Sequence, residues 1–297
     1  MAAADVARLL TLAALWGGSF AFIRVAVAST GPLWLAASRV TLAFLALFAV
    51  AILRRNLPAL RERWRDFFVL GVLNSALPFA FFCFAEQFIG GSTAAVLNAT
   101  SPFFASLVAA IWLRDRIAPA QVSGMILGIG GVGLLVGWQP QALSGDVLLA
   151  VGACLAAALC YGISSVYAKA RMAGVPSFAT ALYSQMAAAL VFVPALPFTP
   201  LPGALTPLVA ANIIALALAS TAFAYLLYFR LIATIGPARA LTVTFLSPLF
   251  GLLWGYLFLG ESIGINMLAG CAMILLGTWL ALRSGPRAVV DRAAERG

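Results

Sequence analysis

The 297-residue sequence contains no histidine, only nine acidic residues and only four cysteines. The lack of histidine removes the commonest metal ligand and the commonest general base. Cys83, Cys154, Cys160 and Cys271 all fall in apolar stretches without metal-ligand spacing, so we interpret them as packing residues. No Ser/Lys or paired-Asp pattern of an intramembrane enzyme occurs either. We therefore expect no enzymatic activity, no catalytic residue, no metal site and no cofactor.

Charge is also scarce. Charged residues make up 9% of the chain and hydrophobic residues 64%, and the mean hydropathy is +1.06. These values exclude a soluble globular domain. The net charge of +9 does not indicate nucleic-acid binding, because nucleic-acid readers display Lys and Arg on a solvated surface that this sequence lacks. The sequence predicts a protein surrounded by the lipid bilayer, with no nucleic-acid partner.

Apolar stretches of about 20 residues, the length that crosses the hydrocarbon core of a bilayer, dominate what is present. They are mostly continuous and rich in Leu and Ala, which favours helices over a membrane β-barrel. The predicted spans are residues 8–28, 33–53, 67–88, 92–113, 119–138, 147–168, 177–195, 208–229, 239–259 and 264–282. We therefore expect an all-α membrane protein with ten transmembrane helices.

The positions of Lys and Arg predict the orientation of these spans, since short cytoplasmic loops carry an excess of both. If the N-terminus is cytoplasmic, all but two of the 18 Lys and Arg residues fall at cytoplasmic termini or in inner loops. The exceptions, Arg24 and Arg39, lie inside spans. The pattern predicts a multi-pass protein of the plasma membrane with both termini in the cytoplasm and a first span that is retained.

An internal repeat appears when the sequence is shifted by 146 residues. The shift aligns residues 90–134 with residues 236–280 and places one Ser-Pro dipeptide on another. Each half then carries five spans, and because five is odd, the second half crosses the membrane in the opposite orientation. We expect two inverted five-helix repeats, residues 1–138 and 147–283, followed by a cytoplasmic tail at 284–297.

Four segments carry a family resemblance: "LLTLAALWGGSFAFIRVA", "GPLWLAASRVTLAFLAL", "AAVLNATSPFFASLVAAIWLRDRI" and "ALTVTFLSPLFGLLWGYLFLGESIGINMLAGCAMILLG". Their order, with a proline at the centre of the fourth and ninth spans and an acidic residue after each, resembles the two EamA-type halves of the drug/metabolite transporter superfamily. Within it, the chain is most similar to the YddG-type bacterial amino-acid exporters. The resemblance implies an inner-membrane transporter whose pathway is lined by spans one, three, four, six, eight and nine.

The two Ser-Pro dipeptides lie at matched depths. Pro102 and Pro248 are each about ten residues, or ~15 Å, from one end of their span, which is near the bilayer midplane. Each proline frees the carbonyl four residues earlier, on Asn98 and on Thr244. A freed carbonyl at that depth needs a partner or a wet cavity. We expect both carbonyls to face a central substrate cavity, with kinks closed by neighbouring hydroxyls as the alternative.

The expected cavity combines these polar groups with a third break at Pro78 and with aromatic walls, although packing or lipid-facing positions are the alternative for about half of the rings. Because this lining has few fixed charges, it suits neutral or zwitterionic metabolites. The predicted cavity residues are Trp16, Asn74, Pro78, Phe79, Phe82, Asn98, Ser101, Pro102, Tyr161, Tyr225, Tyr228, Thr244, Ser247 and Pro248.

Three ionisable residues inside spans, Arg24, Arg39 and Glu86, are predicted in the outer third of the bilayer, where charge costs less than the ~2.5–3.5 kcal/mol of the centre. We expect Glu86 to pair with one of the arginines, as an outer gate or as a contact for a substrate carboxylate. Snorkelling to the headgroups is the alternative. If protons drive transport, Glu86 is the main carboxylate in the membrane, and uniport stays open.

These features predict a secondary transporter that exports small metabolites, with amino acids favoured, by alternating access around a midplane cavity. Efflux of lipophilic cations or multiple drugs is one alternative, and a sensor or receptor without transport is an alternative of another class. Small-residue pairs such as Gly124/Gly128 and Gly251/Gly255 are commonest in packing within one chain, so a monomer is favoured over a dimer.

Overall fold

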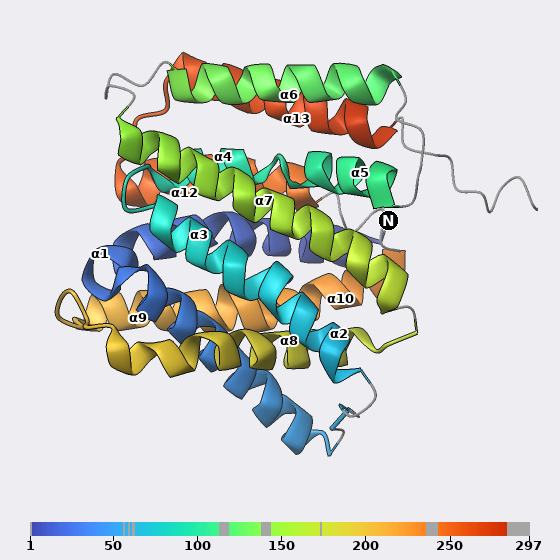
Figure 1. Cartoon of the computed structure of the whole chain (residues 1–297), viewed down its shortest axis with the longest axis vertical. Helices are drawn as coiled ribbons and strands as arrows, with labels where there is room; N and C mark the ends of the chain where they lie inside the picture. The colour runs from blue at the N-terminus through green and yellow to red at the C-terminus, as the bar shows by residue number, and fades with distance from the viewer. Residues whose placement is uncertain are drawn as a thin grey trace, which may run out of the picture.

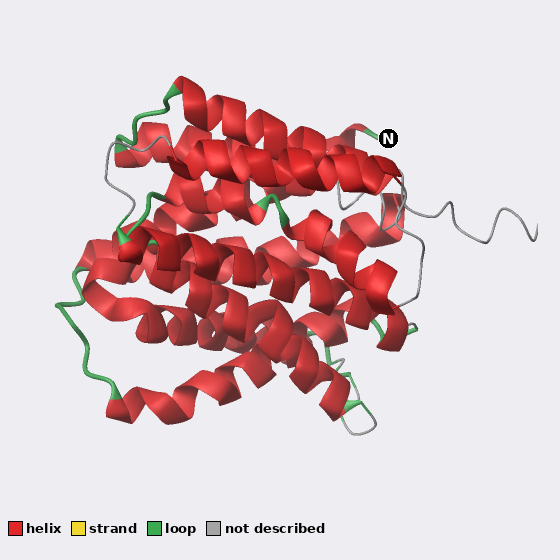
Figure 2. Ribbon diagram, turned by 45° about the horizontal axis from the view of Figure 1, so that its top comes forward, coloured by secondary structure: helices red, strands yellow, loops and turns green. Residues whose placement is uncertain are grey.

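Every regular element in the described part of the chain is a helix (Figure 2). The computed structural model describes residues 2–55, 57–58, 60, 63–112, 119–137, 144–172, 174–235 and 243–283. Within these residues, six helical segments are long and apolar enough to cross a membrane, and three shorter apolar helices accompany them. This architecture is that of an all-helical, multi-pass membrane protein. The predicted tail, 284–297, lies outside the described residues.

The helices follow one another with short connections. In chain order they are α1 (Ala3–Leu53), α2 (Trp64–Gly71), the π-helix η1 (Val72–Ala76), α3 (Leu77–Ala85), α4 (Gly91–Asn98), α5 (Ser101–Trp112), α6 (Pro119–Gly137), α7 (Gly145–Arg171), α8 (Ser177–Phe192), the 3-10 helix η2 (Val193–Phe198), α9 (Pro207–Ala217), the π-helix η3 (Leu218–Phe223), α10 (Ala224–Ile235), α12 (Val243–Leu259) and α13 (Ile265–Arg283).

A sharp bend in α1 replaces the expected loop between the first two predicted spans. Gly31 has φ 71°, a left-handed conformation that glycine adopts without a Cβ clash, and Pro32 follows it. Because proline lacks an N–H and has a preset φ, it suits the first turn of the helix that continues. Residues 3–30 and 32–53 therefore form two straight parts that meet at an angle (Figure 1).

Two π-helical segments interrupt long apolar helices at equivalent positions. They begin at Val72 and Leu218, separated by the 146 residues that align the two halves of the sequence. In the first, the Leu77 N–H donates to the Val72 carbonyl five residues back, and Pro78 lies in the first turn of α3. The extra residue of the π turn accommodates the proline, so the chain stays helical where we expected a break.

Glycines allow two close helix crossings that match each other. A Cβ on Gly17 would lie 2.5 Å from the Ser247 carbonyl oxygen, so α1 crosses α12 beside its proline. A Cβ on Gly162 would lie 2.8 Å from the backbone of Phe104 and Ala105, so α7 crosses α5 beside Pro102 in the same way. The two crossings hold the Ser-Pro segments against the helices that carry Trp16 and Tyr161.

Helices α6 and α13 form a pair at one edge of the molecule, at the top of Figure 1. A Cβ on Gly277 of α13 would lie 2.5 Å from the Gly124 carbonyl oxygen and 2.8 Å from the Gly128 nitrogen of α6. The small-residue spacing of Gly124 and Gly128 therefore serves a contact within the chain.

Hydrogen bonds tie helix ends together at two opposite ends of the bundle. At the end where the N-terminus lies, the Thr234 hydroxyl at the end of α10 donates to the Asp5 carboxylate (3.0 Å; Figure 1). At the other end, the Gly203 N–H donates to the Ser29 carbonyl (2.9 Å). Each bond joins segments that the distribution of Lys and Arg assigns to the same side of the membrane.

Replacement of Gly162 by Ala tests the close crossing of α7 and α5. The added methyl group would press on the α5 backbone, so we expect the free energy of unfolding to fall by about 1–3 kcal/mol. Gly152→Ala on the same helix is the matched control, because nothing lies within 4 Å of a Cβ there. That variant should be neutral or slightly stabilising. Thermal unfolding in detergent measures both, and equal effects of the two variants would contradict the crossing.

Candidate functional site

A cavity of about 270 Å³ lies among the helices. Its volume is just below the ~300–1,000 Å³ of sites for drug-sized ligands, so it suits a small metabolite. Both halves of the chain line it, through α1, η1, α3, α4, α5, α7, η3, α10 and α12. The lining residues are Trp16, Ser19, Phe20, Ile23, Arg39, Asn74, Phe79, Phe82, Asn98, Ser101, Pro102, Ala105, Tyr161, Ser165, Ser220, Thr221, Tyr225, Tyr228, Thr244 and Ser247.

Twelve of the predicted cavity residues are among them, and two are not. Pro78 and Pro248 are buried inside helices, outside this lining. Sequence reasoning did not select Ser19, Ser165 or Thr221. The 146-residue offset could have found the first two, because Ser19 and Ser165 are equivalent under it.

Equivalent positions of the two halves meet at the cavity. Six pairs of lining residues are 146 positions apart: Ser19/Ser165, Asn74/Ser220, Phe79/Tyr225, Phe82/Tyr228, Asn98/Thr244 and Ser101/Ser247. In most pairs the two members are similar in size, and each pair is aromatic or polar throughout. The cavity therefore lies where corresponding faces of the two halves come together.

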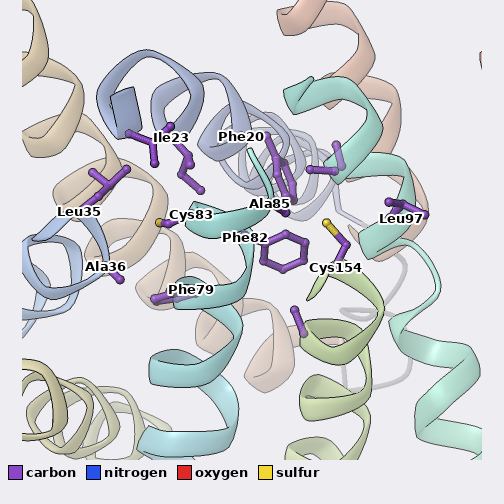
Figure 3. Close-up of a cluster of buried hydrophobic side chains, with 14 of the residues drawn as sticks. Phe20, Ile23, Leu35, Ala36, Phe79, Phe82, Cys83, Ala85, Leu97 and Cys154 are labelled. Atoms are coloured by element: carbon purple, nitrogen blue, oxygen red, sulfur yellow. The ribbon is translucent and has the colours of Figure 1, made fainter. Parts of the chain in front are cut away.

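Aromatic rings form two walls. The Trp16 and Tyr228 ring centroids are 5.3 Å apart, and those of Phe82 and Tyr161 are 6.4 Å apart in a stacked arrangement. Phe20 meets Phe82 edge to face at 5.3 Å, and Figure 3 shows these two rings close together between α1 and α3. Each wall thus joins a ring from the first half to a ring from the second.

A polar network crosses the cavity at the π-helix η1. The Asn74 amide nitrogen donates to the Tyr225 hydroxyl (3.1 Å), and the Ser164 hydroxyl donates to the Asn74 amide oxygen (3.1 Å). Asn74 is therefore held between α7 and α10 by hydrogen bonds at both ends of its amide. Such a residue keeps one orientation and can present a defined surface to a ligand.

The prediction of open carbonyls at the Ser-Pro dipeptides is wrong for Asn98. The chain does break there, since α4 ends at Asn98 and α5 starts at Ser101. However, the Ser101 hydroxyl donates to the Asn98 carbonyl (2.7 Å), so a neighbouring hydroxyl closes the gap. In α12 the helix continues through Pro248, and the Ser247 hydroxyl donates to the Val243 carbonyl (2.9 Å). At Asn98, a serine hydroxyl therefore satisfies the carbonyl that the proline frees.

Arg39, one of the two arginines predicted as a partner of Glu86, lines the cavity and does not bind the Glu86 carboxylate. Its side chain is buried, its Nε donates to the Thr221 hydroxyl (2.9 Å), and its guanidinium carbon lies 3.6 Å from the centroid of the Phe79 ring. The ring face and the hydroxyl offset part of the cost of burying the cation. Among the described residues, ion pairs form only between Arg8 and Asp5 and between Arg171 and Asp66.

The predicted pairing of Glu86 with Arg24 is also wrong. The Arg24 Nη1 donates to the backbone carbonyl of Glu86 and not to its carboxylate. Glu86 follows the last residue of α3, where helix carbonyls lack intrahelical partners and attract a cation. The Arg24 guanidinium, which we expected to bind the Glu86 carboxylate, therefore binds the C-terminus of α3 instead.

Glu261, which follows α12, holds the N-terminus of α4. Its two carboxylate oxygens accept the N–H groups of Gly91 (2.8 Å) and Ser92 (2.9 Å). The 146-residue shift within the chain places Glu261 on Asp115, but it does not predict this contact, because Glu261 and its partners are about 170 residues apart. Asp115 lies outside the described residues.

Replacement of Glu261 tests this cap. Glu261→Ala leaves two N–H groups without acceptors, and we expect the free energy of unfolding to fall by about 1–3 kcal/mol. Glu261→Gln keeps one acceptor oxygen and should fall between Ala and the wild type. Gln87→Ala, at an exposed side chain of the same end, is the control. Thermal unfolding of purified protein measures the order, and an Ala variant as stable as the wild type would exclude the cap.

Residues 6–137 and 148–283 both match the model of the EamA-like transporter family. An uncharacterized transporter of Archaeoglobus fulgidus is 28% identical over 276 residues, which cover 90% of this chain and 95% of that protein. A probable terminal-alkyne amino-acid exporter of Streptantibioticus cattleyicolor is 27% identical, with 90% of each chain covered.

Two further similarities extend over most of the chain. An S-adenosylmethionine/S-adenosylhomocysteine transporter of Chlamydia muridarum is 28% identical, covering 89% of this chain and 86% of that protein. A protein of known crystal structure superposes with a TM-score of 0.66 at 20% identity, covering 99% of this chain and 100% of that one. The latter similarity concerns the fold alone.

Proposed function

The chain belongs to the EamA-like transporter family, and from this premise we propose that it is a secondary transporter that exports amino acids or similar carboxylate-bearing metabolites across the bacterial inner membrane. The observation that carries the substrate class is Arg39, a buried cation in the cavity wall without a carboxylate partner among the described residues. The YddG-type exporters remain the subgroup that we favour.

The proposed architecture has ten transmembrane helices in two inverted repeats, residues 1–138 and 147–283. Division of α1 at Gly31 and the nine apolar helical segments support this number. The matching π-helices and the matching crossings at Gly17 and Gly162 support a repeat. With both termini in the cytoplasm, the hydrogen bonds between helix ends join segments of the same side. A monomer is favoured, because the glycine spacing of α6 serves contacts within the chain.

A carboxylate fits Arg39 for electrostatic reasons. A buried guanidinium without a counter-charge is costly, and a ligand carboxylate would remove that cost when it binds. The Thr221 contact uses Nε, so the two terminal nitrogens of the guanidinium are positioned to bind both oxygens of a carboxylate. The aromatic walls at Trp16 and Tyr161 offer ring faces to an ammonium group. A zwitterion would therefore find complementary groups in one cavity.

The names of the relatives agree with this chemistry. Terminal-alkyne amino acids, S-adenosylmethionine and S-adenosylhomocysteine all carry an α-amino carboxylate. Efflux of lipophilic cations fits less well, because the ionised group of the described lining is Arg39, which is positive, and no carboxylate lines the cavity there. A sensor would bind the ligand without moving it.

Counterflow of a panel of radiolabelled amino acids in proteoliposomes tests the proposal. Arg39→Gln should raise KM about 10- to 100-fold, the effect of losing hydrogen bonds to a charged group, and Arg39→Lys should retain part of the affinity. Arg8→Gln is the control, because Arg8 pairs with Asp5 at the start of α1, outside the lining. Movement of a lipophilic cation instead of amino acids would favour efflux, and binding without any counterflow would favour a sensor.

A further inference from the structure

Glu86 is a buried acid whose carboxyl group receives no hydrogen bond from the described residues. Its side chain is 0% exposed, and neither carboxyl oxygen has a hydrogen-bond partner in the described part of the chain. The residue follows α3 one helical turn beyond Phe82, which lines the cavity. A fully buried, unpartnered carboxyl group beside a transport cavity needs a physical explanation.

The charged and titratable groups that interact electrostatically with Glu86 come from α1, α3, α7 and the segment after α12, and α4 contributes none. They are Arg24 and Arg39 on α1, Cys83 on α3, Cys154 on α7 and Glu261 after α12. None of them bonds the Glu86 carboxyl group: Arg24 binds the Glu86 backbone carbonyl, and Arg39 binds Thr221 and the Phe79 ring. Glu261 adds a second acidic group nearby, which disfavours a second negative charge.

The two neighbouring acids differ in what surrounds their oxygens. Glu261 accepts two backbone N–H groups of α4, an arrangement that suits a carboxylate. Glu86 has no donor, and an ionised carboxylate buried without a donor is far more costly than the neutral acid. Neutrality removes that cost, and a carboxyl group becomes neutral by binding a proton.

We propose that Glu86 is a proton-binding site that couples transport to the proton gradient. The inference rests on the proposed transport function and adds a second ligand to it, a proton, at a place separate from the substrate cavity. In the conformation described here the carboxyl group holds the proton. The proton comes from water and returns to water on whichever side the site faces, so no other reactant takes part.

The backbone of α1 and α4 encloses the Glu86 carboxyl group. A Cβ on Gly91 would lie 3.4 Å from the Glu86 Oε2 and 3.1 Å from the Phe20 carbonyl oxygen, so the carboxyl group is enclosed where α1 and α4 meet. Glu261 fastens the same end of α4. Separation of α4 from Glu261 and α1 would admit water, and a hydrated carboxyl group ionises readily. Since Phe20 and Phe82 also line the cavity, this movement would reach the substrate.

Glu86→Gln tests the site in proteoliposomes, with the substrate that counterflow identifies and with the membrane potential clamped. For one proton per substrate, a gradient of one pH unit should change the steady-state accumulation ratio of the wild type by up to about tenfold. Gln has the shape of the neutral acid but cannot release a proton. The variant should still exchange labelled for unlabelled substrate, while its accumulation ratio stays about one in either direction of the gradient.

Asp66→Asn is the matched control, because Asp66 is a buried acid whose partners, Tyr167 and Arg171, are present and which lies outside the lining. It should accumulate substrate as the wild type does. A second measurement does not depend on transport. Infrared difference spectra should show the band of a protonated carboxyl group in the wild type at neutral pH, and the Glu86→Gln variant should lack this band.

Three results would overturn the proposal: a wild type that ignores the pH gradient, a Glu86→Gln variant that still responds to it, or a carboxyl band unchanged in that variant. These differ from failure of the proposed function, in which the wild type would exchange no member of the substrate panel while the infrared measurement still reports on Glu86.

Discussion

In hydrocarbon, every backbone N–H and C=O group must find a partner within the protein, and the rest of this structure depends on that constraint. It explains why the described elements are all helices. It also explains how two irregularities are closed locally: the Ser101 hydroxyl donates to the Asn98 carbonyl, and the Thr221 hydroxyl of the second π-helix donates to the Leu216 carbonyl of α9. Helix breaks survive here because short polar side chains replace the lost bonds.

The irregular segments are also the ones that form the cavity. The two π-helices supply Asn74 and Thr221, and the end of α4 supplies Asn98. A π turn or a helix end directs side chains and backbone groups away from the regular helical lattice, so polar groups accumulate where helices of both halves meet. The same groups then hold Arg39, whose Nε is bound by Thr221 in the π-helix. The features that satisfy the backbone therefore also organise the site.

Charged side chains inside the bundle also need partners. Arg39 is partly compensated by a ring face and a hydroxyl, and we propose that a substrate carboxylate completes the compensation. Glu261 is compensated by two N–H groups of α4. Glu86 has neither, and we propose that a proton compensates it. A substrate carboxylate and a proton would thus bind at neighbouring places, with α3 connecting Glu86 to Phe79 and Phe82 in the cavity wall.

The amino-acid sequence by itself determined the membrane class, the approximate helix boundaries and most of the cavity lining, because hydrophobic length and the 146-residue offset are properties of the chain alone. Twelve of 14 predicted cavity residues line one cavity, and their selection combined the repeated prolines with the aromatic residues of the spans that the family resemblance implies. The tertiary structure decided which groups the buried charged side chains bind. Whether Arg24 binds the carboxylate or the carbonyl of Glu86, and whether Glu261 reaches α4, depends on ångström-scale distances between helices far apart in the sequence, which no local pattern encodes.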